Sequence, residues 1–301
     1  MKLIAYAQGD TVGIGELAAS GDVIFPVRAA GIDPADGIRS MVELASSGES
    51  LPRGDRESPI QLSAVRVRAP LPRPRRNIFC VGKNYFDHAE EFARSGFDSS
   101  AASGAIPEAP IIFSKVPECV IADGEEVVFD PAVTQAVDYE AELAVIIGRG
   151  GRGIRKEDAM EHVWGYTIIN DVTARDLQGR HKQWLIGKSL DTFCPMGPVA
   201  VTADELDLDN ARVRCWVNDE LRQDASVPQL IFDIPTLIAA ISAGITLYPG
   251  DVIATGTPAG VGIGFDPPRY LQSGDAVMVE IDGIGRLSNT FRSTQEITEA
   301  V

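Results

Sequence analysis

The sequence has 301 residues, of which 45% are hydrophobic and 23% are charged, an ordinary globular composition that is sufficient for one large domain or two unequal ones. Its formal net charge of −16 disfavours nucleic acid or an anionic membrane as a partner, because phosphate groups repel an acidic surface. The four cysteines form no C-x-x-C pair, which argues against structural zinc and disulfides. Because no apolar segment approaches twenty residues and no signal peptide is recognisable, we expect a cytoplasmic protein.

The first 70 residues contain short strand-like segments separated by Gly-Asp turn signals. After them, Ile38, Met41 and Val42 recur at helical spacing, and this segment ends at Gly48. Three prolines in residues 70–76 then make a stiff, basic joint. The pattern predicts a small N-terminal domain of residues 1–72 and a second domain of residues 73–301.

The second domain begins with a buried strand over residues 77–82 and a short amphipathic helix over residues 85–96. His88 and Glu91 lie three positions apart on this helix, so their side chains can meet on one face. A carboxylate that orients an imidazole favours its protonated form, as a general base requires, although such a pair is also a common surface contact. Residues 97–110 are weakly apolar, and we expect a mobile lid there.

Carboxylates alternate at the start of a buried strand. Asp138, Glu140 and Glu142 precede the apolar run of residues 143–147, and alternate residues of a strand share one face. The strand-like residues 165–170 run directly into Asp171. A hard divalent cation with oxygen ligands would neutralise this repulsion, whereas the alternative is the solvated face of a half-exposed strand.

Two further positions have two interpretations each. Lys188 follows an apolar run, so its ammonium is either desolvated beside carboxylates, where it would stabilise an enolate, or extended to water from a strand edge. Thr257 lies in a glycine-rich turn, which is either an anion-binding nest or simply a tight turn.

The remaining segments are mainly strands. Residues 211–224 read as two strands around an Asn-Asp turn, and residues 233–244 as a helix capped by Asp233 and ended by Gly244. Strands and an Asp-Gly hairpin close the chain. Because strands and helices do not alternate regularly, we predict a mostly β fold with few helices (α+β), rolled or sandwiched.

Five motifs occur in an order that resembles the fumarylacetoacetate hydrolase (FAH) family. They are VGKNYFDHAEEF, DYEAELAVIIG, GYTIINDVTARDLQ, GKSLDTFCPMGP and ATGTPAGVG, within residues 76–292. The resemblance implies a mixed β-sandwich roll with a small N-terminal β-rich unit, and a homodimer. It also implies an enzyme of aromatic catabolism similar to the bacterial acylpyruvases and fumarylpyruvate hydrolases.

The resemblance also assigns roles to individual residues. It implies that one Mg²⁺ or Mn²⁺ ion per subunit binds to Glu140, Glu142 and Asp171. It places a water-activating dyad on His88 and Glu91, a further catalytic group on Lys188, and substrate contacts on three residues, Arg175, Gln178 and Thr257. Residues 179–187 vary in length and charge within the family, so the contacts at the far end of the substrate stay open.

The implied activity is metal-dependent hydrolysis of a C–C bond in a 2,4-dioxo acid, which gives pyruvate and a carboxylic acid. His88, oriented by Glu91, would deprotonate water, and Lys188 with the metal would hold the charge of the enolate. Decarboxylation of a 2-oxo diacid such as oxaloacetate, and isomerisation of a hydroxyhepta- or hydroxymuconate-type dienedioate, use the same motifs. A non-catalytic protein that binds a metal or metabolite is the remaining alternative. In each case the expected partner is a small oxo acid.

Overall fold

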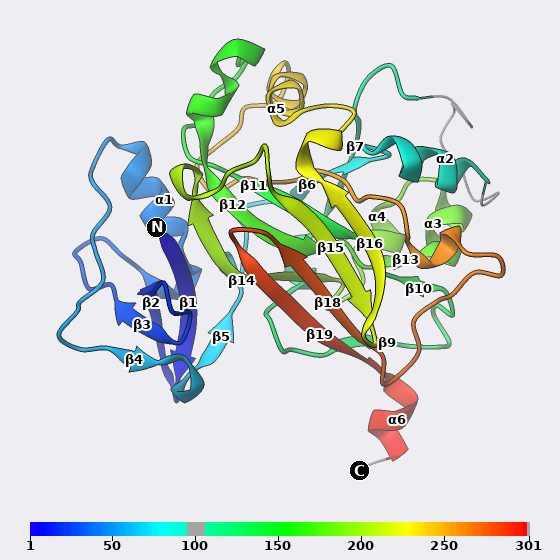
Figure 1. Cartoon of the computed structure of the whole chain (residues 1–301), viewed down its shortest axis with the longest axis horizontal. Coiled ribbons are helices and arrows are strands. Elements are labelled where there is room, and N and C mark those ends of the chain that lie inside the picture. The colour runs from blue at the N-terminus through cyan, green and yellow to red at the C-terminus, as the bar shows by residue number, and fades with distance from the viewer. Residues whose placement is uncertain (95–105, 300–301) are drawn as a thin grey trace.

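The computed structural model describes residues 1–94 and 106–299, and its chain is mostly β, as predicted (Figure 1). Most of the expected lid, residues 97–105, lies outside the described residues. Two large sheets form the body of the molecule, and a pair of short strands, β10 (Val137–Asp138) and β13 (Thr173–Ala174), lies beside them.

The larger sheet has twelve strands, ten of which follow the order β4-β3-β2-β1-β14-β12-β11-β17-β6-β7, while β5 pairs with β1 and β8 with β14. Its strands are β1 (Lys2–Gln8), β2 (Thr11–Leu17), β3 (Val23–Pro26), β4 (Ile60–Gln61), β5 (Arg66–Arg68), β6 (Ile78–Gly82), β7 (Ile111–Lys115), β8 (Val120–Ile121), β11 (Ala141–Ile147), β12 (Val163–Asn170), β14 (Cys194–Thr202) and β17 (Val252–Ala254). Because β1 pairs with β14, main-chain hydrogen bonds join the N-terminal strands to the rest of the sheet. The domain division at residue 72 stays a prediction.

The smaller sheet packs against the centre of the larger one. Its strands, in the order β16-β15-β18-β19-β9, are β9 (Val127–Phe129), β15 (Arg212–Val217), β16 (Glu220–Ser226), β18 (Ala276–Ile281) and β19 (Gly285–Ser293). Contacts of β15, β18 and β19 with β11, β12 and β14 enclose one apolar core, which includes Val145, Ile168, Val213 and Leu287. This is the sandwich that the sequence predicts, and it buries the strand that carries the carboxylates.

The helices lie around this sandwich (Figure 1). They include α1 (Arg39–Ser46), α2 (Phe86–Arg94), α3 (Arg175–His181), α4 (Leu185–Lys188), α5 (Ile234–Ser242) and α6 (Thr294–Glu299). The predicted cap of α5 is present, since Asp233 accepts a hydrogen bond from the Thr236 amide at 2.9 Å. Helices α3 and α4 contact each other, and α4 contacts β7, so the segments that carry Arg175 and Lys188 meet at one end of the sheet.

None of the helices within residues 1–94 and 106–299 combines the length and apolar character that crossing a membrane requires.

Candidate active site

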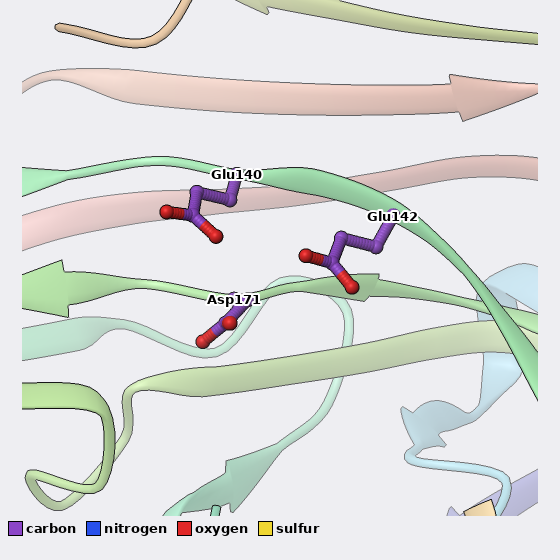
Figure 2. Close-up of side chains that lie close together, drawn as sticks. All are labelled: Glu140, Glu142 and Asp171. Carbon is purple, nitrogen blue, oxygen red and sulfur yellow. The ribbon is translucent and has the colours of Figure 1, made fainter. Parts of the chain in front are cut away.

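Three carboxylates converge where β11 and β12 meet. The register pairs Ala141 with Asn170, and the Asp171 amide donates to the Glu140 carbonyl at 2.8 Å, which places Asp171 beside Glu140. Figure 2 shows the side chains of Glu140, Glu142 and Asp171 turned toward one another. One oxygen of each lies within 4.8 Å of the others, and the residues are 5%, 1% and 0% exposed. This burial excludes a solvated strand face.

Three cationic side chains hold this carboxylate cluster. The Lys188 ammonium lies between Glu140 Oε2, at 2.7 Å, and Asp171 Oδ2, at 2.8 Å. Arg175 Nη1 contacts Glu140 Oε1 at 2.8 Å, and Lys115 Nζ contacts Asp171 Oδ1 at 2.7 Å. Since the cations are buried as well, each attraction acts in a medium that screens it weakly.

Lys115 is a site residue that the sequence did not predict. It ends β7, is fully buried, and also donates to the Val172 carbonyl at 3.1 Å. Burial by itself would lower the pKa of Lys115, but the Asp171 carboxylate, together with the nearby cysteines, outweighs burial and raises it. The only signal in the sequence is a lysine that closes a short apolar strand, and such lysines usually reach solvent.

Asp138 does not join the cluster, although the alternation suggested a shared face. It lies in β10, where its carboxylate accepts from Arg175 Nε at 2.8 Å. The same carboxylate accepts from the amides of Gly262 at 2.7 Å and Ile263 at 3.0 Å. Asp138 therefore positions Arg175 and fixes the glycine-rich loop over residues 256–264.

Glu142 has one satisfied and one unsatisfied oxygen. Its Oε2 accepts from the Gly256 amide at 2.9 Å, whereas its Oε1 is buried without a hydrogen-bond partner among residues 1–94 and 106–299. Gly256 has φ +103°, and a Cβ there would lie 2.7 Å from the Asn84 Cβ, so only glycine brings its amide this close. A buried carboxylate oxygen without a partner requires an explanation, and a bound cation provides one.

The pKa values of Glu140 and Glu142 are shifted in opposite directions. Burial, with the charges of Asp171 and Glu140, raises the pKa of Glu142 well above its usual value. Burial acts in the same direction on Glu140, but Lys188 and Arg175 outweigh it and lower the pKa of Glu140 to about 2. Without a metal, Glu142 is the carboxyl that holds a proton.

This cluster fits a hard divalent cation. Its carboxylates supply the oxygen ligands that Mg²⁺ and Mn²⁺ prefer, and one buried oxygen has no other partner. Four carboxylates, Asp138 included, face three cations, so the charges balance while Glu142 holds its proton, and a divalent ion that displaces this proton leaves an excess of one positive charge. The bound ion would thus add positive charge where an anionic substrate binds.

Metal binding should therefore depend on pH. An ion that binds to Glu142 must displace its proton, so we expect the apparent affinity for Mg²⁺ to rise with pH by up to about tenfold per unit below the raised pKa. Calorimetric titration with Mg²⁺ in two buffers of different ionisation enthalpy checks this. Binding of the ion should release protons, and an apparent affinity that does not change with pH would contradict this expectation.

The predicted histidine pair is present on α2. His88 Nδ1 lies 3.3 Å from Glu91 Oε2, and both carboxylate oxygens of Glu91 accept from the Gly260 amide, at 3.0 and 3.2 Å. His88 is only 5% exposed. The loop that carries Gly260 thus fixes Glu91, and Glu91 in turn orients the imidazole.

One small cavity joins these groups. About 290 Å³ of space is lined by residues that include His88, Glu140, Arg175, Gln178, Lys188 and Thr257. Every residue that the sequence singled out for substrate contact lies on this cavity.

Gln178 and Thr257 are each held by a neighbour. Gln178 Oε1 accepts from Arg175 Nη1 at 3.1 Å, and Thr257 Oγ1 accepts from Gln223 Nε2 at 2.7 Å. Gln223 is buried on β16, and its Oε1 accepts from the Ala141 amide at 3.1 Å, which ties the loop to the start of β11. This role could not be predicted from the sequence, because Gln223 alternates with exposed residues in an ordinary edge strand.

Comparison with known proteins agrees with the fold. The profile of the fumarylacetoacetate (FAA) hydrolase C-terminal family matches residues 77–292. Oxaloacetate tautomerase YisK of Bacillus subtilis is 53% identical over 229 residues, which cover 76% of this chain and 73% of that protein. The human mitochondrial oxaloacetate tautomerase FAHD2A is 45% identical over 230 residues, which cover 75% of this chain and 69% of that protein. The chain belongs to the fumarylacetoacetate hydrolase family.

Solved structures extend the similarity to nearly the whole chain. A fumarylacetoacetate hydrolase from Exiguobacterium antarcticum has a TM-score of 0.83 and 41% identity, and the match covers 97% of this chain and 99% of that one. Maleylpyruvate hydrolase from Sphingobium, solved with manganese(II) and pyruvate, has a TM-score of 0.76 and 31% identity, with coverage of 97% and 99%. Similar proteins thus carry out different reactions on this fold, and one binds a divalent metal together with a 2-oxo acid.

Proposed function

We propose that this protein is a divalent-metal-dependent enzyme that interconverts the enol and keto forms of a 2-oxo diacid, with oxaloacetate as the substrate. The observation that carries the proposal is that His88, held by Glu91, lines the same small cavity as Lys188 and Glu140. A proton-transfer group and a cation-rich anion site therefore face one bound molecule. The similarity to proteins named oxaloacetate tautomerases favours this reaction over others that the site could perform.

The reaction moves one proton. The enol loses the proton of its C2 hydroxyl, the resulting enolate gains a proton at C3, and the product is the keto acid with no net change in composition. His88 is the group that exchanges this proton, because it is the imidazole on the cavity and Glu91 orients it. Lys188 and Arg175 bring positive charge to the enolate and the adjacent carboxylate. A bound divalent ion would add Lewis-acid stabilisation of the same negative charge.

We expect His88→Ala to reduce kcat for oxaloacetate tautomerisation by about 10²–10⁴-fold, the usual contribution of a general acid–base group. The decay of enol absorbance in the presence of Mg²⁺, with deuterium incorporation at C3 in D₂O, measures the reaction. His181→Ala is the matched control, since His181 is exposed. Turnover of His88→Ala within about tenfold of the unmodified protein would remove His88 from the mechanism.

Cleavage of the substrate is the second candidate function. The His88–Glu91 pair favours hydrolysis among the cleavage reactions, because it can also activate water. Hydrolysis of an acylpyruvate would yield pyruvate and a carboxylic acid, and decarboxylation of oxaloacetate would yield pyruvate and CO₂. Incubation with Mn²⁺ and a panel of acylpyruvates, oxaloacetate and hydroxymuconate-type diacids, followed by product analysis, separates these reactions from tautomerisation. Tautomerisation predicts rapid loss of the enol without pyruvate.

We also propose that the protein is a homodimer and that it is located in the cytoplasm. Sedimentation velocity at micromolar concentration tests the first, and the expected particle has twice the mass of the 32.2 kDa chain.

A further inference from the structure

The side-chain amide of Gln223 can adopt only one orientation. Its Nε2 donates to the Pro258 carbonyl at 2.7 Å, and its Oε1 accepts from the Ala141 amide at 3.1 Å. A carbonyl oxygen cannot donate and a backbone N–H cannot accept, so exchange of the amide oxygen and nitrogen would break both hydrogen bonds. Gln223 is 1% exposed, and broken hydrogen bonds are costly at such a position. The two main-chain partners therefore determine which atom of Gln223 faces Thr257.

This orientation fixes the polarity of the hydrogen bond between Gln223 and Thr257. Nε2 carries hydrogens and cannot accept, so Thr257 Oγ1 must be the acceptor over their distance of 2.7 Å. A hydroxyl group has one hydrogen to donate, and here that hydrogen must point away from Nε2. Within the parts of the chain that the structure describes, no atom accepts a hydrogen bond from the Thr257 hydroxyl.

The nearby Thr255 provides a contrast. Its hydroxyl donates to the Leu143 carbonyl at 2.9 Å, so its hydrogen is used within the fold. Thr257 instead belongs to the lining of the cavity that Arg175 and Lys188 also border. Because the hydroxyl oxygen of threonine is bonded directly to Cβ, it stays close to whichever part of the residue borders the cavity. A bound carboxylate has the complementary polarity, since it only accepts hydrogen bonds.

We propose that Gln223 is a positioning residue that makes the Thr257 hydroxyl a hydrogen-bond donor to a carboxylate of the substrate. This inference rests on the proposed function, because it concerns how the same site binds its substrate. Gln223 acts through Thr257, since its amide already donates to Thr257 and to the Pro258 carbonyl.

Gln223→Glu tests the polarity of this hydrogen bond. Glutamate keeps an acceptor for the Ala141 amide but replaces the donor Nε2 with an oxygen, so the Thr257 hydroxyl turns to donate to it. We expect KM for oxaloacetate to rise about tenfold or more, because the bound substrate loses a hydrogen bond to a charged acceptor. Since this bond contributes to binding, kcat should change by less than about threefold. Gln61→Glu, at an exposed position, is the control and should change neither parameter.

The hydroxyl itself is tested by two substitutions of Thr257. Thr257→Val removes the hydroxyl with little change of shape and should raise KM for oxaloacetate by about tenfold, whereas Thr257→Ser keeps the donor and should recover most of the affinity. An unchanged KM in Thr257→Val would overturn the proposal, whether or not the Gln223 variants fold.

A double-mutant cycle shows whether Gln223 acts through Thr257. Gln223→Met removes the donor without adding charge, and we expect it to raise KM at least about threefold when Thr257 is present. In the Thr257→Val background the same substitution should leave KM unchanged, because the hydroxyl that Gln223 orients is absent. Equal increases of KM in the two backgrounds would overturn the proposal.

Two further measurements address a structural role and a failure of the proposed function. Gln223 also holds Ala141, which lies between Glu140 and Glu142, so a purely structural role would weaken Mg²⁺ binding. We expect no loss of calorimetric Mg²⁺ affinity in Gln223→Glu, because the hydrogen bond to Ala141 remains, and a loss as large as the rise in KM would overturn the proposal.

If the unmodified protein does not turn over oxaloacetate, the proposed function fails. Calorimetric titration of the same variants with pyruvate in the presence of Mg²⁺ then decides the role of Gln223 through the same cycle, with the dissociation constant in place of KM. If the unmodified protein binds neither acid, this inference is overturned as well.

Discussion

Replacement of Glu142 by glutamine should abolish most of the activity and yet leave the metal-free protein at least as stable as the unmodified one. Glutamine keeps an acceptor for the Gly256 amide but removes one of the three carboxylates that converge. We expect kcat/KM to fall by about 10³-fold or more, since the stabilisation of a developing negative charge depends on the bound ion. The rise in melting temperature on addition of Mg²⁺ should also disappear.

The stability of this variant has a predicted dependence on pH. The folded-state pKa of Glu142 is raised, so its contribution to the stability of the metal-free protein is present below the unfolded pKa and is lost as pH rises toward the folded pKa. Glu142→Gln escapes this loss, and its advantage in melting temperature should be absent near pH 4 and grow as pH rises. The control is Glu57→Gln, an exposed position that should change neither property. Full Mg²⁺-dependent activity in Glu142→Gln would contradict the assignment.

Replacement of Lys188 by methionine should separate metal binding from catalysis. The ammonium of Lys188 bridges Glu140 and Asp171, so its removal leaves two buried carboxylates without their shared partner. The metal-free variant should lose about 3–5 kcal/mol of stability, the usual cost of breaking a buried ion pair. A divalent ion then replaces more of the missing charge, so we expect tighter Mg²⁺ binding and a larger Mg²⁺-induced rise in melting temperature than in the unmodified protein.

Activity should move in the opposite direction, with kcat for oxaloacetate falling by about 10²–10³-fold because the enolate loses a neighbouring cation. Lys156→Met is the matched control, since Lys156 pairs with Asp233 at 3.0 Å on the surface and both side chains are more than half exposed. Such a surface pair contributes little to stability. Weaker Mg²⁺ binding in Lys188→Met, or unchanged turnover, would show that this lysine does not balance the carboxylate cluster.

Local chemistry explains which parts of the fold could be predicted from the sequence. Asn218 and Asp219 both adopt positive φ, 48° and 68°, and join β15 to β16 in the hairpin that the Asn-Asp turn indicated. Asp233 caps α5, as its position before a proline-containing apolar run suggested. Each of these features depends on a few consecutive residues.

The pairing of strands that are distant in the sequence could not be predicted. The strands β8 and β9 flank one Asp-Gly turn, but β8 pairs with β14 in the larger sheet, and β9 pairs with β19 in the smaller one. Both pairs are parallel, so no local turn determines them. Lys115 was missed for the same reason, because the contact with Asp171 joins residues 56 positions apart.

The carboxylate cluster could be predicted in part from the sequence. Alternation placed Glu140 and Glu142 on one face, and Asp171 was suggested by its position at the end of a second strand. The register of β11 and β12 brings Asp171 alongside them. Asp138 shows where alternation fails, since it lies in the separate strand β10 and binds Arg175 instead.

The most direct test of the metal centre is the anomalous diffraction of crystals soaked in Mn²⁺. We predict one strong peak per chain at bonding distance from Glu140, Glu142 and Asp171, with Glu142 Oε1 as one of the ligand atoms. A Mn²⁺-activated protein whose crystals show the ion elsewhere, with Glu142 Oε1 still uncoordinated, would contradict the account.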